Sequence, residues 1–312
     1  MKDGAERTGR VGAVLHRALG MWELYLMLLL PLAWYVVFQY IPIYGVQIAF
    51  KDFLATRGIT GSPWVGFKHF RRFFSSYYFG RLVGNTVGIS LYTMALGFPL
   101  PIFLALLINE IPGKRFQKAV QNITYVPYFL SVVVIVGILN MLLHPSTGVV
   151  NRLILALGGK EAVRFLEKPE YFKTIYVVSN VWQNMGWNSI IYLAALAGVD
   201  QALHEAASID GASRLQRINH IALPALLPTI SILFILRVGT IMNVGFEKVF
   251  LMQNALNMAG SDVISTFVYR TGILGADYSF SAAVGLFNSL INFALLFGVN
   301  ALSRRLQQTS LW

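Results

Sequence analysis

Six long apolar stretches dominate this sequence of 312 residues. Each is about 20 residues or longer, which is enough for an α-helix to cross the hydrocarbon core of a bilayer. We therefore predict an all-α membrane protein with six transmembrane helices. The predicted spans cover residues 22–41, 85–108, 119–143, 174–199, 224–246 and 280–302.

The composition agrees with this class of protein. Apolar residues make up 56% of the chain and charged residues only 12%, which is too few charges for a soluble domain of this size. The chain has no cysteine, which excludes disulfides and thiolate metal sites. Its formal charge of +11 would suit nucleic acid, but the basic residues are scattered between the apolar stretches. Anionic lipid and the positive-inside bias explain them, so we predict a membrane lipid partner and no nucleic acid.

The basic residues also set the predicted orientation. Residues 1–21 carry four of them and no recognisable cleavage site, so we expect a basic cytoplasmic amino terminus that leads into a six-span membrane domain at residues 22–303. An even number of spans then places residues 200–224 and the tail, residues 304–312, in the cytoplasm. The short turn from Asn109 to Lys118 holds three basic residues and is cytoplasmic in the same arrangement.

The motifs of membrane enzymes are incomplete in this chain. His204-Glu205 begins a zinc-protease motif, but Ser208 stands where the second histidine is required. Gly158-Gly159-Lys160 ends like a phosphate-binding loop, but Ile154 replaces its first glycine. We therefore predict no catalytic residue, no metal site and no bound cofactor. An ion-coupled transporter would need carboxylates deep within its spans to relay protons, and the predicted spans carry none away from their ends.

Residues 200–224 read as two helices separated by a glycine corner. Ala202, Leu203, Ala206 and Ala207 recur at the spacing of one helical face. Gly211 permits a turn that other residues avoid, and Ser213 is suited to cap a second short helix. Pro224 fits the first turn of the helix that follows, where its missing N–H costs nothing.

This segment resembles a known family. Glu205-Ala206-Ala207, three residues, Gly211, nine residues, Ile221, one residue and Leu223-Pro224 match at every position the cytoplasmic "EAA loop" of bacterial ABC-importer permeases. The resemblance implies the type I importer fold and a loop that docks into a cleft on a separate ATPase. The coupling residues that it implies are Glu205, Ala206, Ala207, Asp210, Gly211, Arg214, Ile221, Leu223 and Pro224.

Further features resemble the polysaccharide-type branch of carbohydrate permeases, which is related to the maltose-type permeases. They are Pro63-Trp64-Val65-Gly66, Asn85-Thr86 and the terminal Ser310-Leu311-Trp312. The resemblance implies a bacterial inner-membrane subunit that imports oligosaccharides or polysaccharide fragments by alternating access. It also implies four partners in addition to substrate: a second homologous permease, two copies of an ATPase that uses ATP and Mg, and an extracytoplasmic solute-binding protein. The same architecture serving another small solute is the alternative.

The resemblance also implies that sugar contacts lie on the helices that flank the EAA loop, residues 200–224, which we call the coupling loop. The candidates here are Trp182, Asn184, Trp187, Asn188, Arg237 and Asn243. Indole rings stack on the apolar faces of sugars, and amides pair with hydroxyls. The tryptophans also suit a membrane interface, and the asparagines suit bonds between helices. Arg237 either meets an acidic, uronic-acid-containing substrate or has a structural partner such as a carboxylate of the second permease.

Overall fold

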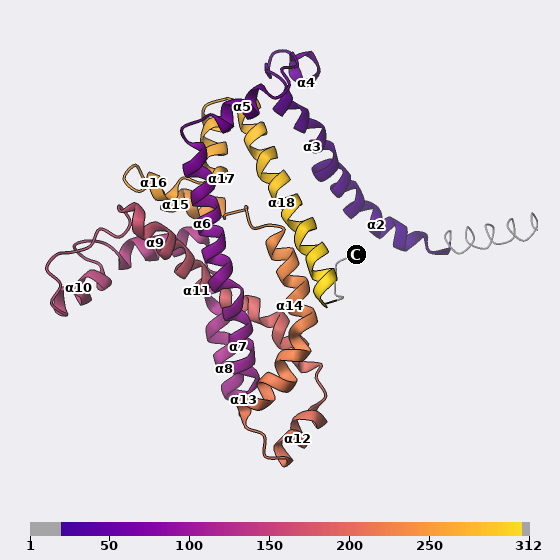
Figure 1. Ribbon diagram of the computed structural model, residues 1–312, viewed down its shortest axis with the longest axis vertical. Helices are drawn as coiled ribbons and strands as arrows, with labels where there is room; N and C mark the ends of the chain where they lie inside the picture. Colours follow the sequence, from indigo (N-terminus) through magenta and orange to yellow (C-terminus); the bar gives the residue numbers. More distant parts are fainter. Residues whose placement is uncertain (1–19, 308–312) are drawn as a thin grey trace, which may run out of the picture. The chain divides into compact units, whose positions relative to one another are not determined.

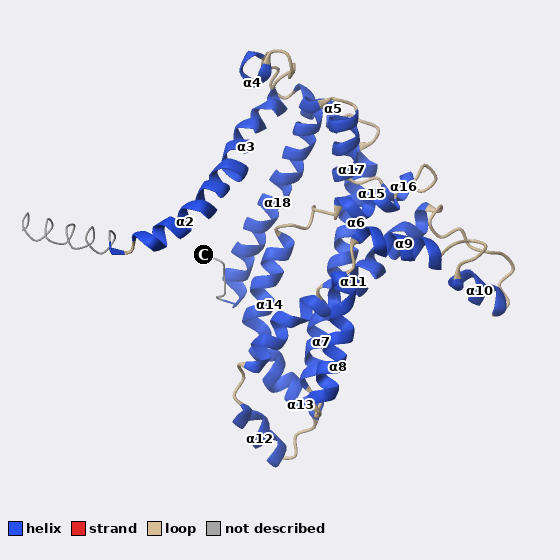
Figure 2. Cartoon of the chain, turned by 180° about the vertical axis from the view of Figure 1, so that it is seen from behind, coloured by secondary structure: helices blue, strands red, loops and turns tan. Residues whose placement is uncertain are grey.

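The computed structural model describes residues 20–307, so most of the basic leader and the end of the tail, with Ser310-Leu311-Trp312, lie outside the described residues. The chain divides into two compact units, Met1–Lys68 and His69–Trp312. The described residues form helices and loops (Figure 2), and their only β-pairing is an isolated antiparallel bridge between Lys51 and Trp64. The predicted all-α class is confirmed.

The first unit contains one helical path of 29 residues, from Trp22 to Phe50. Its parts are α2 (Trp22–Tyr35), the π-helical η1 (Val36–Tyr40), α3 (Ile41–Ile43) and the 3-10 helix η2 (Tyr44–Phe50). Apolar side chains occur on every side of it, as is typical of a helix in lipid. The short helix α4 (Gly58–Gly61) follows, and the Lys51 Nζ donates a hydrogen bond to the Ile59 carbonyl at 2.6 Å.

The second unit is a bundle of long helices with short helices at its two ends. Figure 1 shows α12 and α13 at the end opposite α5 and α17. The elements are α5 (Lys68–Phe74), which begins at the last residue of the first unit, α6 (Phe79–Gly97), α7 (Pro99–Asn109), α8 (Lys114–Tyr125), η3 (Val126–Phe129), α9 (Val132–Leu142), α10 (Val149–Ala156), α11 (Pro169–Ala197), α12 (Gln201–Ile209), α13 (Arg214–Arg217), η4 (Ile218–Ala222), α14 (Leu223–Val238), α15 (Phe246–Met252), α16 (Met258–Ser261), α17 (Ile264–Val268), η5 (Tyr269–Leu274) and α18 (Tyr278–Gln307).

Four helical paths within residues 20–307 are long and apolar enough to cross a membrane. They are Trp22–Phe50, Phe79–Asn109, Arg214–Val238 and Tyr278–Arg305. The predicted span 174–199 corresponds to α11, which is 29 residues long but is not among them. Its middle carries Asn180, Gln183, Asn184 and Asn188, and these polar side chains lower its hydropathy.

The predicted span 119–143 is broken, and the prediction of one continuous helix there is wrong. Lys114–Phe129 and Val132–Leu142 meet at 97°. Ser131 starts a new helix at the bend, because its hydroxyl accepts the N–H of Val134 at 3.3 Å. The Leu130 carbonyl, which the bend leaves outside a helix, accepts a hydrogen bond from the Gln183 side chain of α11 at 3.1 Å. The bent pair raises the number of candidate spans to five, below the six predicted.

The predicted span 224–246 is also too long, because α14 ends at Val238. The chain from residue 239 to 245 is a turn, although apolar residues continue through it. Most of its backbone N–H groups bond to carbonyls three or four residues earlier, and the N–H of Met242 instead donates to the Asn292 Oδ1 of α18 at 2.9 Å. Arg237, which lies about midway along the predicted span, is therefore in the last turn of α14.

Three apolar clusters hold the second unit together. The first joins α6, α9, α11 and α15, the second joins α5, α6, α17 and α18, and the third joins α7, α11 and α14. Representative fully buried members are Ile89, Val177 and Val249 in the first, Phe73, Leu82 and Val284 in the second, and Ala105 and Leu226 in the third. α6 contributes to the first and second clusters and α11 to the first and third, so these two helices connect all three clusters.

Candidate functional site

A polar cavity lies between α6, α11 and α14. It consists of two adjoining parts with volumes of about 360 and 300 Å³. Both parts are lined by Thr93, Asn180, Asn184, Asn188 and Arg237. These shared side chains make the two parts one site, which we call the polar cavity.

One wall of the polar cavity is a row of three amides on α11. Asn180, Asn184 and Asn188 are spaced four residues apart, so they share one face of the helix. The Asn184 Nδ2 donates to the Asn180 carbonyl at 2.8 Å. Amides both donate and accept hydrogen bonds, so such a row is suited to the hydroxyl groups of a sugar.

Arg237 supplies the charge of the polar cavity. Its side chain is exposed and lines both parts. No acidic residue of the described chain lines either part, and none forms an ion pair with Arg237. The guanidinium can therefore pair with an anion that enters the cavity.

The remaining predicted path residues differ in their positions. Asn243 lines the cavity, and its Oδ1 accepts hydrogen bonds from Asn288 and Asn292 of α18 at 3.1 and 3.0 Å. Trp187 also lines the cavity, but one face of its ring stacks on Tyr128 with 4.4 Å between ring centres. Trp182 lies elsewhere, in an apolar depression of about 420 Å³ between α9 and α11.

Several lining residues were missed from the sequence. Asn180 was detectable, because it continues the face of Asn184 and Asn188 by one turn. Thr93 and Ser90 gave no signal, since hydroxyl residues are common in apolar helices, where they can bond to their own backbone. Tyr176 and Gly245 also line the cavity, and the side chain of Tyr176 is directed at the backbone of Gly245.

The predicted local structure of the coupling loop is confirmed. The Asp200 side chain caps α12 by accepting the N–H of Ala202 at 2.9 Å. Gly211 has a φ of +79°, and the Ala212 N–H reaches back to the Ala207 carbonyl at 2.8 Å, which together end α12 in a Schellman motif. Ser213 and Gln216 form a capping box at the start of α13.

The predicted coupling residues lie at the tip and the base of this loop. Glu205, Ala206, Asp210, Gly211 and Arg214 are exposed, and Pro224 is exposed in the first turn of α14. Ala207, Ile221 and Leu223 are half-buried. Three large apolar side chains, Leu203, Ile209 and Leu215, are also exposed on the loop. A cleft of about 710 Å³ lies between the loop and the turn that joins α7 to α8.

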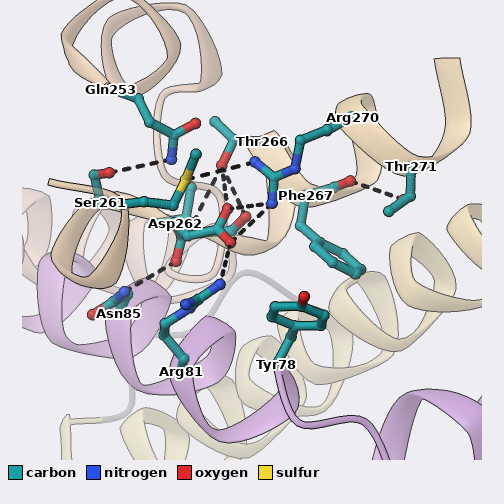
Figure 3. Close-up of polar contacts among 12 residues, drawn as sticks. Tyr78, Arg81, Asn85, Gln253, Ser261, Asp262, Thr266, Phe267, Arg270 and Thr271 are labelled. Atoms are coloured by element: carbon teal, nitrogen blue, oxygen red, sulfur yellow. Dashed lines mark hydrogen bonds and ion pairs between the residues drawn. The ribbon is translucent and has the colours of Figure 1, made fainter. Parts of the chain in front are cut away.

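A buried ionic cluster fixes the opposite end of the unit (Figure 3). Asp262 is fully buried and pairs with Arg81 of α6 at 3.1 Å and with Arg270 of η5 at 2.9 Å. The Asn85 side chain donates to the Asp262 carbonyl at 3.1 Å. These bonds join α6 to the segment from α16 to η5. No group of three His, Asp or Glu side chains within the described residues is placed to hold a metal.

Comparisons with known proteins fit this architecture. Residues 97–308 match the family model "Binding-protein-dependent transport system inner membrane component". The chain is 42% identical to Protein LplB of Bacillus subtilis over 93% of its own length and 91% of the relative's. It is 40% identical to the polygalacturonan/rhamnogalacturonan transport system permease YteP of the same organism, over 93% and 90% of the two chains.

Solved structures agree. A chain in the crystal structure of a bacterial ABC transporter involved in the import of the acidic polysaccharide alginate is 43% identical, with a TM-score of 0.84 over 92% of this chain and 96% of that one. The alginate transporter in complex with an alginate pentasaccharide-bound periplasmic protein matches with 42% identity, a TM-score of 0.85, and coverage of 93% and 96%. The chain therefore belongs to the binding-protein-dependent inner-membrane permeases of ABC transporters.

Proposed function

We propose that this chain is one of two permease subunits of an ATP-driven importer, and that acidic oligosaccharides or polysaccharide fragments pass along its polar cavity. The observation that supports this proposal is that Arg237 and the row of Asn180, Asn184 and Asn188 line one cavity, which no carboxylate of residues 20–307 lines. The amides suit sugar hydroxyls, and the guanidinium suits a uronic-acid carboxylate, to which arginine binds in a bidentate manner.

The relatives support an acidic substrate. One is a permease for polygalacturonan and rhamnogalacturonan, and another belongs to an importer of alginate. Both names describe acidic polysaccharides, and both relatives cover nearly the whole chain. The cavity of this chain has the charge that such a substrate requires.

The proposed assembly has a second, homologous permease, two ATPase copies that use ATP and Mg, and an extracytoplasmic solute-binding protein in the bacterial inner membrane. The exposed apolar side chains of the coupling loop provide a surface for an ATPase. The polar helix α11 is then the sixth span, because a helix that lines a substrate path need not be apolar on the side that faces the path. Both termini are cytoplasmic in this arrangement.

The test is the variant Arg237→Gln in the purified, reconstituted importer with its binding protein. A hydrogen bond to a charged group contributes roughly 1.5–3 kcal/mol, so uptake of an acidic oligosaccharide should fall about ten- to a hundredfold at limiting substrate. Uptake of a neutral oligosaccharide of the same length should not change. Arg237→Lys keeps the charge without the bidentate geometry, so its uptake of the acidic oligosaccharide should lie between that of the parent and that of Arg237→Gln.

The matched control is Arg304→Gln, in the last turn of α18, because Arg304 is exposed and lines neither part of the cavity. It should transport both sugars as the parent does. Equal losses of acidic and neutral sugar in Arg237→Gln would show that Arg237 is structural and would remove the support for an acidic substrate.

A further inference from the structure

Arg217 connects three parts of the cytoplasmic end of the bundle. It lies on α13, and its Nη1 donates to the Ser208 hydroxyl of α12 at 2.9 Å. Its Nη2 donates to the Glu110 carboxylate at 3.2 Å. Ser208 in turn donates to the His204 carbonyl at 2.7 Å, so the guanidinium is also tied to the body of α12. Glu110 is the C-cap residue of α7, which ends at Asn109.

The ion pair is shielded from solvent. The side chains of Arg217 and Glu110 are only 20% and 13% exposed. In the pair of Arg164 and Glu167 the corresponding values are 68% and 36%. A pair at this depth is screened less by salt, and loss of one partner leaves the other charge poorly solvated. Arg214, one turn earlier on the same helix, lines the same cleft without an ion pair in the described chain.

The two ends of this bond lead to two walls of the polar cavity. On one side, α7 runs back from its cap residue Glu110 to Pro101, and the helical path continues through Phe98 to Gly97 at the end of α6; all three residues line the cavity. On the other side, α13 runs through η4 into α14 as one helical path, Arg214–Val238, whose last turn carries Arg237. A displacement of the coupling loop would move α14 directly. It would reach α7 through the apolar cluster that α7 shares with α11 and α14, and through this ion pair, which bonds the end of α7 to α13.

We propose that the ion pair between Arg217 and Glu110 is a latch that makes α7 follow the coupling loop, so that a movement at the ATPase reaches both walls of the polar cavity together. This role rests on the proposed import function. Arg217 and Glu110 are positioning residues that do not touch the substrate.

Charge exchange tests the latch in the reconstituted importer. The variants are Arg217→Glu, Glu110→Arg and the combination of the two, and the readout is the amount of oligosaccharide taken up per ATP hydrolysed. Allosteric couplings commonly change an equilibrium about 5- to 150-fold, so each single variant should lose uptake per ATP within that range while ATPase copurification and basal hydrolysis persist. The combined variant should recover most of the loss, because the pair is restored in the opposite orientation.

Arg214→Glu is the matched control, since it makes the same charge change in the same cleft. Combining it with Glu110→Arg should bring no recovery. The milder variants Arg217→Lys and Glu110→Gln remain informative if a charge reversal prevents assembly, and both should lower uptake per ATP without loss of the ATPase.

Three results would overturn the latch: unchanged uptake per ATP in the single and the milder variants, no recovery in the charge exchange, or equal recovery in the Arg214 control. A parent importer that takes up no oligosaccharide would instead contradict the proposed function. The two failures are therefore distinct.

Discussion

Lys248 shows how a single residue can oppose the stability of the fold. It lies on α15, is 4% exposed, and its ammonium forms no hydrogen bond with the described residues. The ammonium makes a cation–π contact with the ring of Tyr176, whose centre is 5.7 Å from the Nζ. Burial lowers the pKa of Lys248 to about 8 from its ordinary 10.5. This difference corresponds to roughly 3 kcal/mol of penalty on the charged form.

We predict that Lys248→Met raises the melting temperature of the purified complex at pH 7, because methionine keeps the length of the chain without the charge. Between pH 8 and 10.5, the Lys248 side chain of the parent is protonated in the unfolded state and deprotonated in the folded state. Stability should therefore rise with pH across this window. The variant should lack that rise, so the two melting temperatures should converge toward pH 10.5.

The exposed lysine Lys160 supplies the control for this experiment. Lys160→Met should leave both the melting temperature and its pH dependence unchanged. A parallel pH response in the parent and in Lys248→Met would show that the burial of Lys248 carries no energetic penalty.

At the residue scale, the sequence was informative where the cause is local. Gly211, Ser213 and Pro224 were placed correctly because a left-handed corner, a helix cap and a first-turn proline depend on a few neighbouring residues. Trp182 and Trp187 were not separable, since the face of α11 that each occupies depends on contacts with α8, η3 and α9. The same limit concealed Thr93 and Tyr176, which join the cavity only through the packing of α6 against α11.

At the element scale, α11 and α8 approach as closely as their backbones allow. Gly186 of α11 is buried, and a Cβ at that position would lie 2.0 Å from the Thr124 carbonyl oxygen. The obstacle is backbone, so no change of rotamer relieves it. The bent segment from α8 to α9 therefore depends on this glycine as well as on the bond from Gln183 to the bend.

We predict that Gly186→Ala destabilises the permease by about 1–3 kcal/mol, the usual range for overpacking. The measurement is the melting temperature and the yield of the assembled complex. Gly137→Ala is the matched control, because Gly137 lies in α9 and a Cβ there would meet no atom within 4 Å. It should be neutral or slightly stabilising. Equal behaviour of the two variants would contradict close packing at Gly186.

The helices themselves were predictable only in part from apolar runs. The stretch at 119–143 reads as one span because Val132 to Leu143 are almost uniformly apolar, but the start of a helix at Ser131 and the bond from Gln183 create a bend. The stretch at 224–246 also reads as one span, because apolar residues continue to its end. The helix stops at Val238, and the N–H of Met242 bonds to Asn292 of α18 instead of to a helical carbonyl. Hydropathy reports lipid solubility, and it does not report where long-range bonds replace helical ones.

At the scale of the whole molecule, the proposed orientation makes a prediction about accessibility. The sequence has no cysteine, so single cysteines can serve as markers. In cells without an outer barrier, an impermeant maleimide should label Glu161→Cys, in the loop after α10. It should label Lys114→Cys, at the start of α8, only after permeabilisation. Both variants should first be shown to support uptake.

Labelling of position 114 in intact cells would contradict a cytoplasmic coupling end, and failure to label position 161 would contradict six crossings. The fold class, the family and the coupling loop followed from the sequence because they depend on composition and on one long motif. The number of crossings did not, since α11 pairs a spanning length with a polar face that only its neighbours explain.

The uninterrupted helical path from Arg214 to Val238 has a consequence for exchanging parts between permeases. Each residue inserted or removed there would rotate Arg237 by about 100° about the helix axis relative to the coupling loop. A single insertion would therefore turn the guanidinium out of the cavity even if every side chain were retained. A coupling loop from another permease can therefore be grafted onto this one only when the number of residues between the loop and Arg237 is preserved.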